Sequence, residues 1–193
     1  MKVTKAQVQA NRTRIVETAS TLFRERGYDG VGVADLMAAA GFTHGGFYKH
    51  FGSKADLMAE AATCGFSQTA AENQGGDRAA FIQQYLSREH RDASGTGCTL
   101  AALSGDAMRQ SDQVRQAFGN GIERLLAAVE SESGADGVAA RREARAEGID
   151  VIAQVVGALV LSRACPDDSP LADEILDVCR SAALSRLATP KKP

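Results

Sequence analysis

The placement of proline limits the fold of this 193-residue chain more than any other feature of its sequence. All four prolines lie near the C-terminus, and residues 1–165 contain none. Proline breaks helices, whereas alanine, which is frequent in that segment, favours them. A hydrophobic share of 44% also supplies enough apolar side chains for a buried core. The sequence therefore predicts an all-α protein.

Three helices are predicted near the N-terminus, over residues 5–26, 33–40 and 44–50, because apolar residues recur there at helical spacing. Gly27 is expected to stop the first helix, and Gly41 to turn the chain where a positive φ is needed. Thr43 is expected to cap the third helix and Ser53 a fourth. Two short helices joined by a glycine turn form a helix-turn-helix pattern.

The predicted third helix contains two adjacent glycines, although each costs about 1 kcal/mol relative to alanine inside a helix. Its exposed face is expected to hold His44, Gly45, Tyr48 and Lys49. Hydrogen-bonding groups and a cation are what a reader of the DNA major groove needs, and Gly45 and Gly46 would let the backbone approach the duplex closely. Alternatively, the two glycines form a loop between core helices.

Charge is unevenly distributed along the chain. Residues 1–54 contain eight Lys/Arg and four Asp/Glu, a local charge of +4, although the whole chain carries −2. A basic segment on an acidic body is typical of an anion-binding region. Chance variation in surface charge is the alternative explanation.

Further helices are predicted over residues 78–91, 98–109, 114–129, 138–164 and 171–187. The last two are apolar on more than one side. One side can face the core of the same subunit, and a two-fold partner commonly buries the other. The sequence therefore favours a homodimer formed through these two helices, with a fully buried helix in a monomer as the alternative.

Several classes of protein are disfavoured. The four cysteines show no paired C-x-x-C spacing, so neither a zinc site nor a disulfide framework is expected. No other metal and no cofactor is expected. The first residues lack the apolar core of a signal peptide, and the longest apolar run, residues 149–161, is too short to span a membrane. A cytoplasmic protein without a membrane partner is the simplest interpretation. Motifs for nucleotide-binding loops, serine hydrolases and zinc proteases are absent, so an enzyme is not expected.

The stretches RIVETASTLFRERGYDG and VADLMAAAGFTHGGFYKHFGSKADL resemble the TetR/AcrR family of bacterial transcriptional repressors. The resemblance implies an all-helical homodimer with a three-helix DNA-binding domain over residues 8–65. It also implies a larger ligand-binding and dimerisation domain over residues 66–190. A small molecule in the second domain would release a palindromic operator from the first. The rival interpretation is a helical protein-interaction module without sequence-specific DNA binding.

By motif position, the resemblance implies DNA contacts from Arg12, Thr43, His44, Gly45, Tyr48, Lys49, His50 and Lys54, with Arg14 as an alternative to Arg12. One position departs from the family. The family usually starts its second helix with Thr or Ser, where this chain has Val31, Gly32 and Val33. The phosphate contact of that hydroxyl is therefore missing.

Cys98 stands at a predicted helix start, where a thiol pKa is lowered. The pattern from Gly97 to Leu103 also resembles a branch of the family in which some members sense electrophiles through a cysteine. An ordinary buried cysteine is the alternative. The candidate effector-pocket residues are Phe66, Phe81, Tyr85, Met108 and Phe118, which also suit a plain helical core.

Overall fold

The computed structural model describes residues 4–72 and 77–188, and no β-strand occurs among them. The all-α fold class is thereby confirmed. The chain divides into two compact units, one of residues 1–69 and 95–121 and the other of residues 70–94 and 122–193. The predicted domains, 8–65 and 66–190, are a functional division, which stays a prediction. Among the described residues, no helix is long and apolar enough to cross a membrane.

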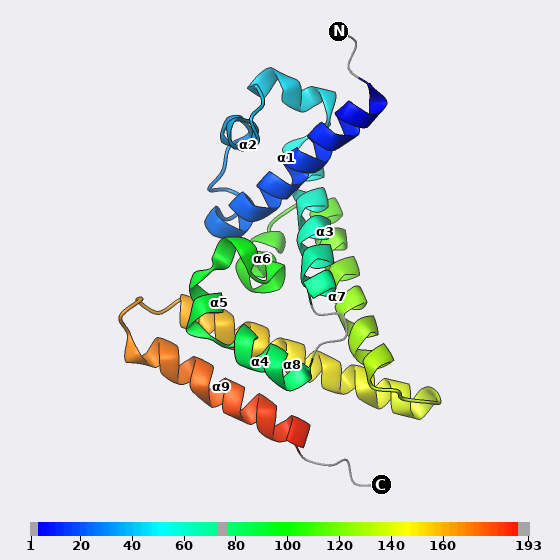
Figure 1. The fold of residues 1–193 in the computed structure, drawn as a ribbon, viewed down its shortest axis with the longest axis vertical. Helices are drawn as coiled ribbons and strands as arrows, with labels where there is room; N and C mark the ends of the chain where they lie inside the picture. Colours follow the sequence, from blue (N-terminus) through cyan, green and yellow to red (C-terminus); the bar gives the residue numbers. More distant parts are fainter. Residues whose placement is uncertain (1–3, 73–76, 189–193) are drawn as a thin grey trace. The chain divides into compact units, whose positions relative to one another are not determined.

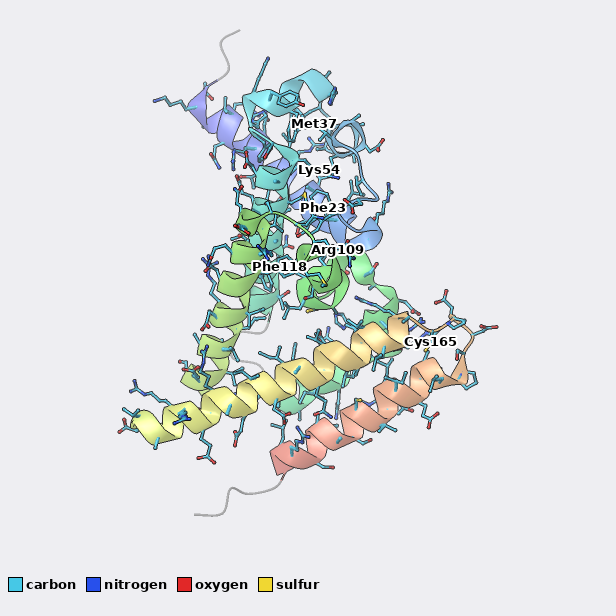
Figure 2. The ribbon with its side chains drawn as sticks, turned by 180° about the vertical axis from the view of Figure 1, so that it is seen from behind. Phe23, Met37, Lys54, Arg109, Phe118 and Cys165 are labelled. Carbon is cyan, nitrogen blue, oxygen red and sulfur yellow. The ribbon has the colours of Figure 1, made fainter. Side chains whose placement is uncertain are left out.

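The first unit begins with the helix-turn-helix elements (Figure 1). Its elements are α1 (Lys5–Arg26), α2 (Val33–Ala39), the 3-10 helix η1 (His44–Lys49), most of α3 (Lys54–Glu72), the end of η2 (Ser94–Thr96), α6 (Thr99–Ala107) and the start of α7 (Asp112–Glu132). Phe23, Met37 and Leu57 are fully buried in this unit, and Figure 2 labels the first two. The predicted stop at Gly27 is confirmed, because its φ is +73° and its N–H donates to the Phe23 carbonyl.

The second unit contains the two longest C-terminal helices. It comprises α4 (Arg78–Tyr85), α5 (Arg88–Asp92), the rest of α7, α8 (Val138–Arg163) and α9 (Pro170–Ala188). In Figure 1, α8 and α9 lie side by side and run in opposite directions. Pro170 occupies the first position of α9, where the missing N–H costs nothing. Leu159 of α8 and Leu176 of α9 are buried, so one face of each helix packs within the unit.

The single helix predicted over residues 78–91 is wrong, because the chain breaks at Leu86 and Ser87. Leu86 leaves the helical region with φ −98° and ψ 38°. Ser87 is extended, and its hydroxyl accepts the His90 N–H at 3.1 Å. A serine inside a periodic stretch has therefore served as the N-cap of a new helix.

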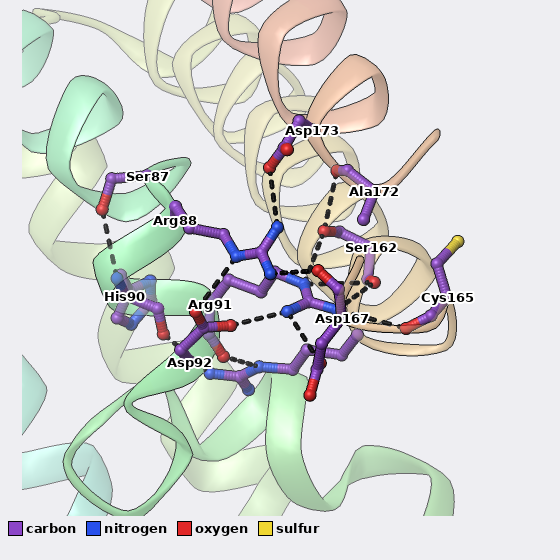
Figure 3. A network of polar contacts seen from close by, with 11 residues as sticks. Ser87, Arg88, His90, Arg91, Asp92, Ser162, Cys165, Asp167, Ala172 and Asp173 are labelled. Carbon is purple, nitrogen blue, oxygen red and sulfur yellow. Dashed lines mark hydrogen bonds and ion pairs between the residues drawn. The ribbon is translucent and has the colours of Figure 1, made fainter. Parts of the chain in front are cut away.

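Arginines join α5 to the end of α8 (Figure 3). Arg91 is only 4% exposed, and it donates to the carbonyls of Ser162 and Cys165 at 3.2 and 3.1 Å. In return, Arg163 donates to the carbonyls of Arg91 and His90 at 2.8 and 3.0 Å. Each helix thus receives a cation at its C-terminus, where unpaired carbonyls and the helix dipole favour positive charge.

Candidate nucleic-acid interface

The turn between α2 and η1 has the geometry that its glycine requires. Gly41 has φ +81°, which confirms the predicted positive value. The Phe42 N–H then donates to the Met37 carbonyl at 2.8 Å and closes the turn. Gly32 precedes α2 without a side-chain cap, as expected where the family has a hydroxyl. The local sequence therefore fixes both the end of α2 and the start of the next segment.

The predicted α-helix over residues 44–50 is instead a 3-10 helix over His44–Lys49. Gly46 N–H donates to the Thr43 carbonyl at 2.9 Å, three residues back. Thr43 occupies the N-cap position, but its side chain makes no capping hydrogen bond. Two glycines lower the preference for an α-helix, and short segments tolerate the tighter 3-10 winding.

Aromatic packing holds η1 in place. Phe47 is buried, and its ring lies 5.5 Å from that of Phe51. Met37 of α2 is also fully buried. Immediately after Phe51, the Ser53 hydroxyl accepts the Asp56 N–H at 3.1 Å, which confirms Ser53 as the cap of α3. The side of η1 opposite these contacts remains free to face a partner.

That opposite side holds the predicted exposed face of His44, Gly45, Tyr48 and Lys49. Together with Thr43, which precedes it, we call this surface the reading face. All five residues are exposed, and Tyr48 is the largest apolar-bodied side chain among them, at 69% exposure. The rings of His44 and Tyr48 lie 6.4 Å apart, edge to face. The structure thus brings these sequence-predicted residues together on one exposed surface.

Gly45 lies in the middle of the reading face, and nothing in the fold requires a glycine there. A Cβ built at Gly45 would have no neighbour within 4 Å. Gly45 does not have a positive φ, so its backbone conformation does not require glycine. A Cβ at Gly46 would make only ordinary contacts, the nearest at 3.6 Å from the Met37 Cε. Glycine at position 45 therefore lowers helix stability relative to alanine, and no packing contact within the protein requires it.

The structure distinguishes Arg12 from Arg14, which the sequence offered as alternative DNA contacts. Arg12 forms two hydrogen bonds to the Glu60 carboxylate, and its guanidinium lies 4.6 Å from the centre of the Phe51 ring. The hydrogen bonds to Glu60 raise the pKa of Arg12 above its ordinary value. Arg14 is exposed beside the turn, 5.9 Å from the Phe42 ring, and no carboxylate in the described residues pairs with it. Arg14, unlike Arg12, therefore has a guanidinium that no ion pair within the described residues neutralises.

The two remaining predicted DNA contacts are partly turned inward. Lys54 is half-buried, and its ammonium donates to the Tyr28 carbonyl at 2.5 Å. His50 is also half-buried, with its ring 6.2 Å from that of Phe51. Sequence reasoning could not find the Lys54–Tyr28 bond, because it joins residues far apart in the chain.

Cys98 lies immediately before α6, close to the predicted helix start. It is 7% exposed and makes no capping hydrogen bond, a burial that also suits the packing alternative. The aromatic pocket candidates form two separate pairs. Phe66 and Phe118 lie 5.4 Å apart in the first unit, and Phe81 and Tyr85 lie 5.4 Å apart in the second.

Met108, the fifth pocket candidate, follows α6 in the first unit and is 69% exposed. Among the described residues, no cluster of potential metal ligands was found.

Comparison with known proteins adds an independent observation. Residues 15–61 match the family described as bacterial regulatory proteins, tetR family. The uncharacterized HTH-type transcriptional regulator Rv0196 of Mycobacterium tuberculosis (strain H37Rv) is 32% identical over 122 residues, which cover 57% of this chain and 60% of the relative. The HTH-type transcriptional repressor DhaR of Mycobacterium sp. (strain GP1) is 31% identical, over 54% of this chain and 56% of its own. The chain thus spans less than two thirds of these relatives' length.

Solved structures share the fold over nearly the whole chain. Escherichia coli NemR in its reduced form has a TM-score of 0.72 at 19% identity, covering 91% of this chain and 96% of its own. A TetR transcriptional regulator from Chloroflexus aurantiacus has a TM-score of 0.69 at 22% identity, with coverages of 95% and 97%.

A helix-turn-helix protein is the class that this fold defines, because α2, the turn at Gly41 and η1 with its exposed face occur in an all-helical chain. Residues 15–61 match the TetR family of bacterial regulatory proteins, and the chain shares the fold of a solved TetR transcriptional regulator. The relatives are named as transcriptional regulators, in agreement with the expectation that this chain is not an enzyme.

Proposed function

We propose that this chain is a DNA-binding transcriptional regulator that reads the major groove with the reading face of η1. Gly45 carries the proposal. It is exposed, its Cβ position is empty, and its φ does not demand glycine. A glycine that weakens its own helix is explained if a duplex must approach its backbone.

The side chains around Gly45 supply the chemistry for this role. His44 and Tyr48 carry hydrogen-bonding groups on exposed rings, and Lys49 adds a cation. Thr43 and Lys49 are proposed to contact phosphates or nearby base edges. Arg14 is proposed as the main cation of α1, because Glu60 occupies Arg12. Lys54 and His50 are proposed as further phosphate contacts at the edge of the surface.

A homodimer is proposed through α8 and α9. Each helix leaves apolar side chains exposed, including Ile149 and Leu161 on α8 and Leu171 and Val178 on α9. A two-fold partner would bury them and would present two reading faces to a palindromic operator.

Repression relieved by a small molecule or electrophile is the proposed mode of regulation. DhaR and NemR are named as repressors, which supports the direction of the effect. Within the first unit, the packed pair Phe66 and Phe118 is proposed to contribute to the effector pocket. Cys98 is proposed as a sensor of electrophiles. Its replacement by serine is expected to abolish electrophile-induced release from DNA, and unchanged release would exclude this role.

The proposed DNA binding is tested by capturing genomic fragments on purified protein at two salt concentrations and sequencing them. Enrichment of one palindrome, weaker at high salt, is expected. Gly45→Leu should fold as stably as the wild type yet lose the enrichment. Gly119→Ala, also at an exposed glycine with an empty Cβ position, should retain it. If Gly45→Leu binds like wild type, or no fragment is enriched, the helical interaction-module interpretation gains support instead.

A further inference from the structure

The imidazole of His44 is the outermost member of a series of aromatic rings that begins in the core of the first unit. The rings of Phe51 and Phe47 lie 5.5 Å apart, and both residues are buried. The Tyr48 ring meets the Phe47 ring edge to face at 5.2 Å, and the His44 ring meets the Tyr48 ring edge to face at 6.4 Å. Such edge-to-face contacts are favourable between aromatic rings at these separations. The imidazole is therefore held by packing on one side, although His44 is exposed.

The other polar side chains of the reading face are positioned less firmly or serve this packing. Lys49 carries its ammonium on a flexible four-carbon stem. Thr43 precedes η1, and its hydroxyl makes no capping hydrogen bond. Tyr48 places its ring between Phe47 and His44. His44 is thus the residue whose hydrogen-bonding atoms are presented outward from a braced ring.

The backbone next to His44 leaves room for a base pair. His44 is the first residue of η1, and Gly45 follows it with no atom within 4 Å of its Cβ position. Both residues are exposed. In helix-turn-helix proteins, the first residues of the second helix reach the base edges in the major groove. Nothing beside the imidazole would therefore hold a base pair away from it.

The chemistry of the reading face suits one base in particular. The imidazole of His44 carries at least one N–H in either protonation state, and the Lys49 ammonium carries three. The five residues of the reading face include no Asn or Gln, which pair with adenine, and no carboxylate, which accepts from cytosine. In the major groove, guanine presents two acceptors, N7 and O6, whereas adenine presents N7 beside an amino donor. A surface rich in donors is complementary to guanine.

We infer that His44 is the specificity-determining residue of the reading face and donates to the guanine of one G·C pair in each half-site of the operator. This inference rests on the proposed DNA-binding function. The imidazole N–H lies between N7 and O6 of guanine, and adenine would oppose it with its own N–H donor. Tyr48 is a positioning residue, because its ring holds the imidazole. Lys49 adds affinity through phosphate without selecting a base.

Titrations of the full chain against the captured palindrome, with each base pair replaced in turn, test the inference. For the wild type, replacing one G·C pair in each half-site by A·T is expected to weaken binding about tenfold. Replacing the same guanine by inosine should leave binding unchanged, because inosine keeps N7 and O6 and lacks only the minor-groove amino group. His44→Ala should bind the G·C and A·T duplexes equally.

Three further variants separate base reading from general affinity. His44→Asn carries a donor and an acceptor, so its preference at that pair should move from guanine to adenine. Tyr48→Phe keeps the bracing ring and should keep the preference for guanine. Lys49→Ala is the matched control from the same face, because it should weaken binding to every duplex by the same factor.

The outcomes distinguish the inference from the proposed function. If His44→Ala weakens binding to all duplexes equally and keeps the tenfold preference, His44 contacts a phosphate, and the inference is overturned while the proposed function stands. The inference also fails if the base pair that depends on His44 is A·T. If the wild type selects no palindrome, the inference and the proposed function fail together.

Discussion

Arg91 of α5 and the exposed cations Lys49 of η1 and Arg14 of α1 use the same charge in opposite ways. Arg91 is buried and directs its donors into the C-terminal carbonyls of α8 (Figure 3). Lys49 and Arg14 are exposed, and no ion pair to either occurs in the described part of the chain. A buried guanidinium with many hydrogen-bond partners stabilises the fold. An exposed cation without an ion-pair partner is instead available to bind an anionic molecule such as DNA.

The largest expected effect follows from removing the inward charge. Arg91→Met should lower the free energy of unfolding by about 3 kcal/mol, because the carbonyls of Ser162 and Cys165 lose the donors of a buried guanidinium. The acidic partners Asp92 and Asp167 remain solvated, so they add little to this loss. Denaturant unfolding measures the change.

Two further variants test whether the guanidinium geometry and its burial account for the effect at Arg91. Arg91→Lys keeps the charge but offers one ammonium in place of the planar fork, so it should recover only part of the stability. Arg115→Ala removes an exposed pair with Asp112 and should change stability by less than about 0.5 kcal/mol. Equal effects at Arg91 and Arg115 would mean that burial of the guanidinium does not matter.

Glycines give the same contrast between the inside and the outside of the first unit. A Cβ at Gly121 of α7 would overlap the ring of Phe66, which is itself packed against Phe118. Gly121→Ala should therefore destabilise the fold by about 1–3 kcal/mol. Gly45→Ala meets open space and should stabilise it by about 0.5–1 kcal/mol. Thermal unfolding of both variants checks the two signs, and destabilisation by Gly45→Ala would remove the observation that carries the proposed function.

Local signals account for what the sequence could predict. Gly27, Gly41 and Ser53 each act on their nearest neighbours, so their caps and turns were predictable from residue type and spacing. Ser87 was missed because it stands in a run whose apolar spacing suits a continuous helix. Its role as an N-cap appears only where the chain has already turned at Leu86.

Long-range partners account for what the sequence could not predict at the interface. Arg12 and Arg14 look equivalent in the sequence, since both are cations on the first helix. Only the fold places Glu60 against Arg12 and leaves Arg14 beside the turn. Likewise, Lys54 matches a DNA-contact motif, but its partner in the free chain is the carbonyl of Tyr28.

The ion pair with Glu60, which Arg12 makes and Arg14 lacks, leads to the next prediction. Arg14→Ala should reduce the slope of log affinity for duplex DNA against log salt concentration by about 1, as expected for one lost phosphate contact. Lys49→Ala should do the same. Arg12→Ala should leave the slope almost unchanged, because Glu60 already neutralises that guanidinium. Binding titrations over several salt concentrations measure the slopes, and a larger change for Arg12 than for Arg14 would show that the ion pair opens on DNA.

The smallest expected effect concerns the acid side of the α5 network. Hydrogen bonds from Arg88 and then Arg91 lower the pKa of Asp92 below its ordinary value. A carboxylate whose pKa is lower in the folded state stabilises the fold above its unfolded pKa, near 4, and that contribution is lost as pH falls through the folded value. Asp92→Asn should therefore be less stable than wild type at neutral pH, with the difference shrinking below about pH 4. Unfolding midpoints measured across this range test the trend. In an Arg88→Gln background the difference should be smaller at every pH, because the largest cause of the shift is gone. A difference that stays constant into acid would mean that Asp92 acts here through its shape and not through its charge.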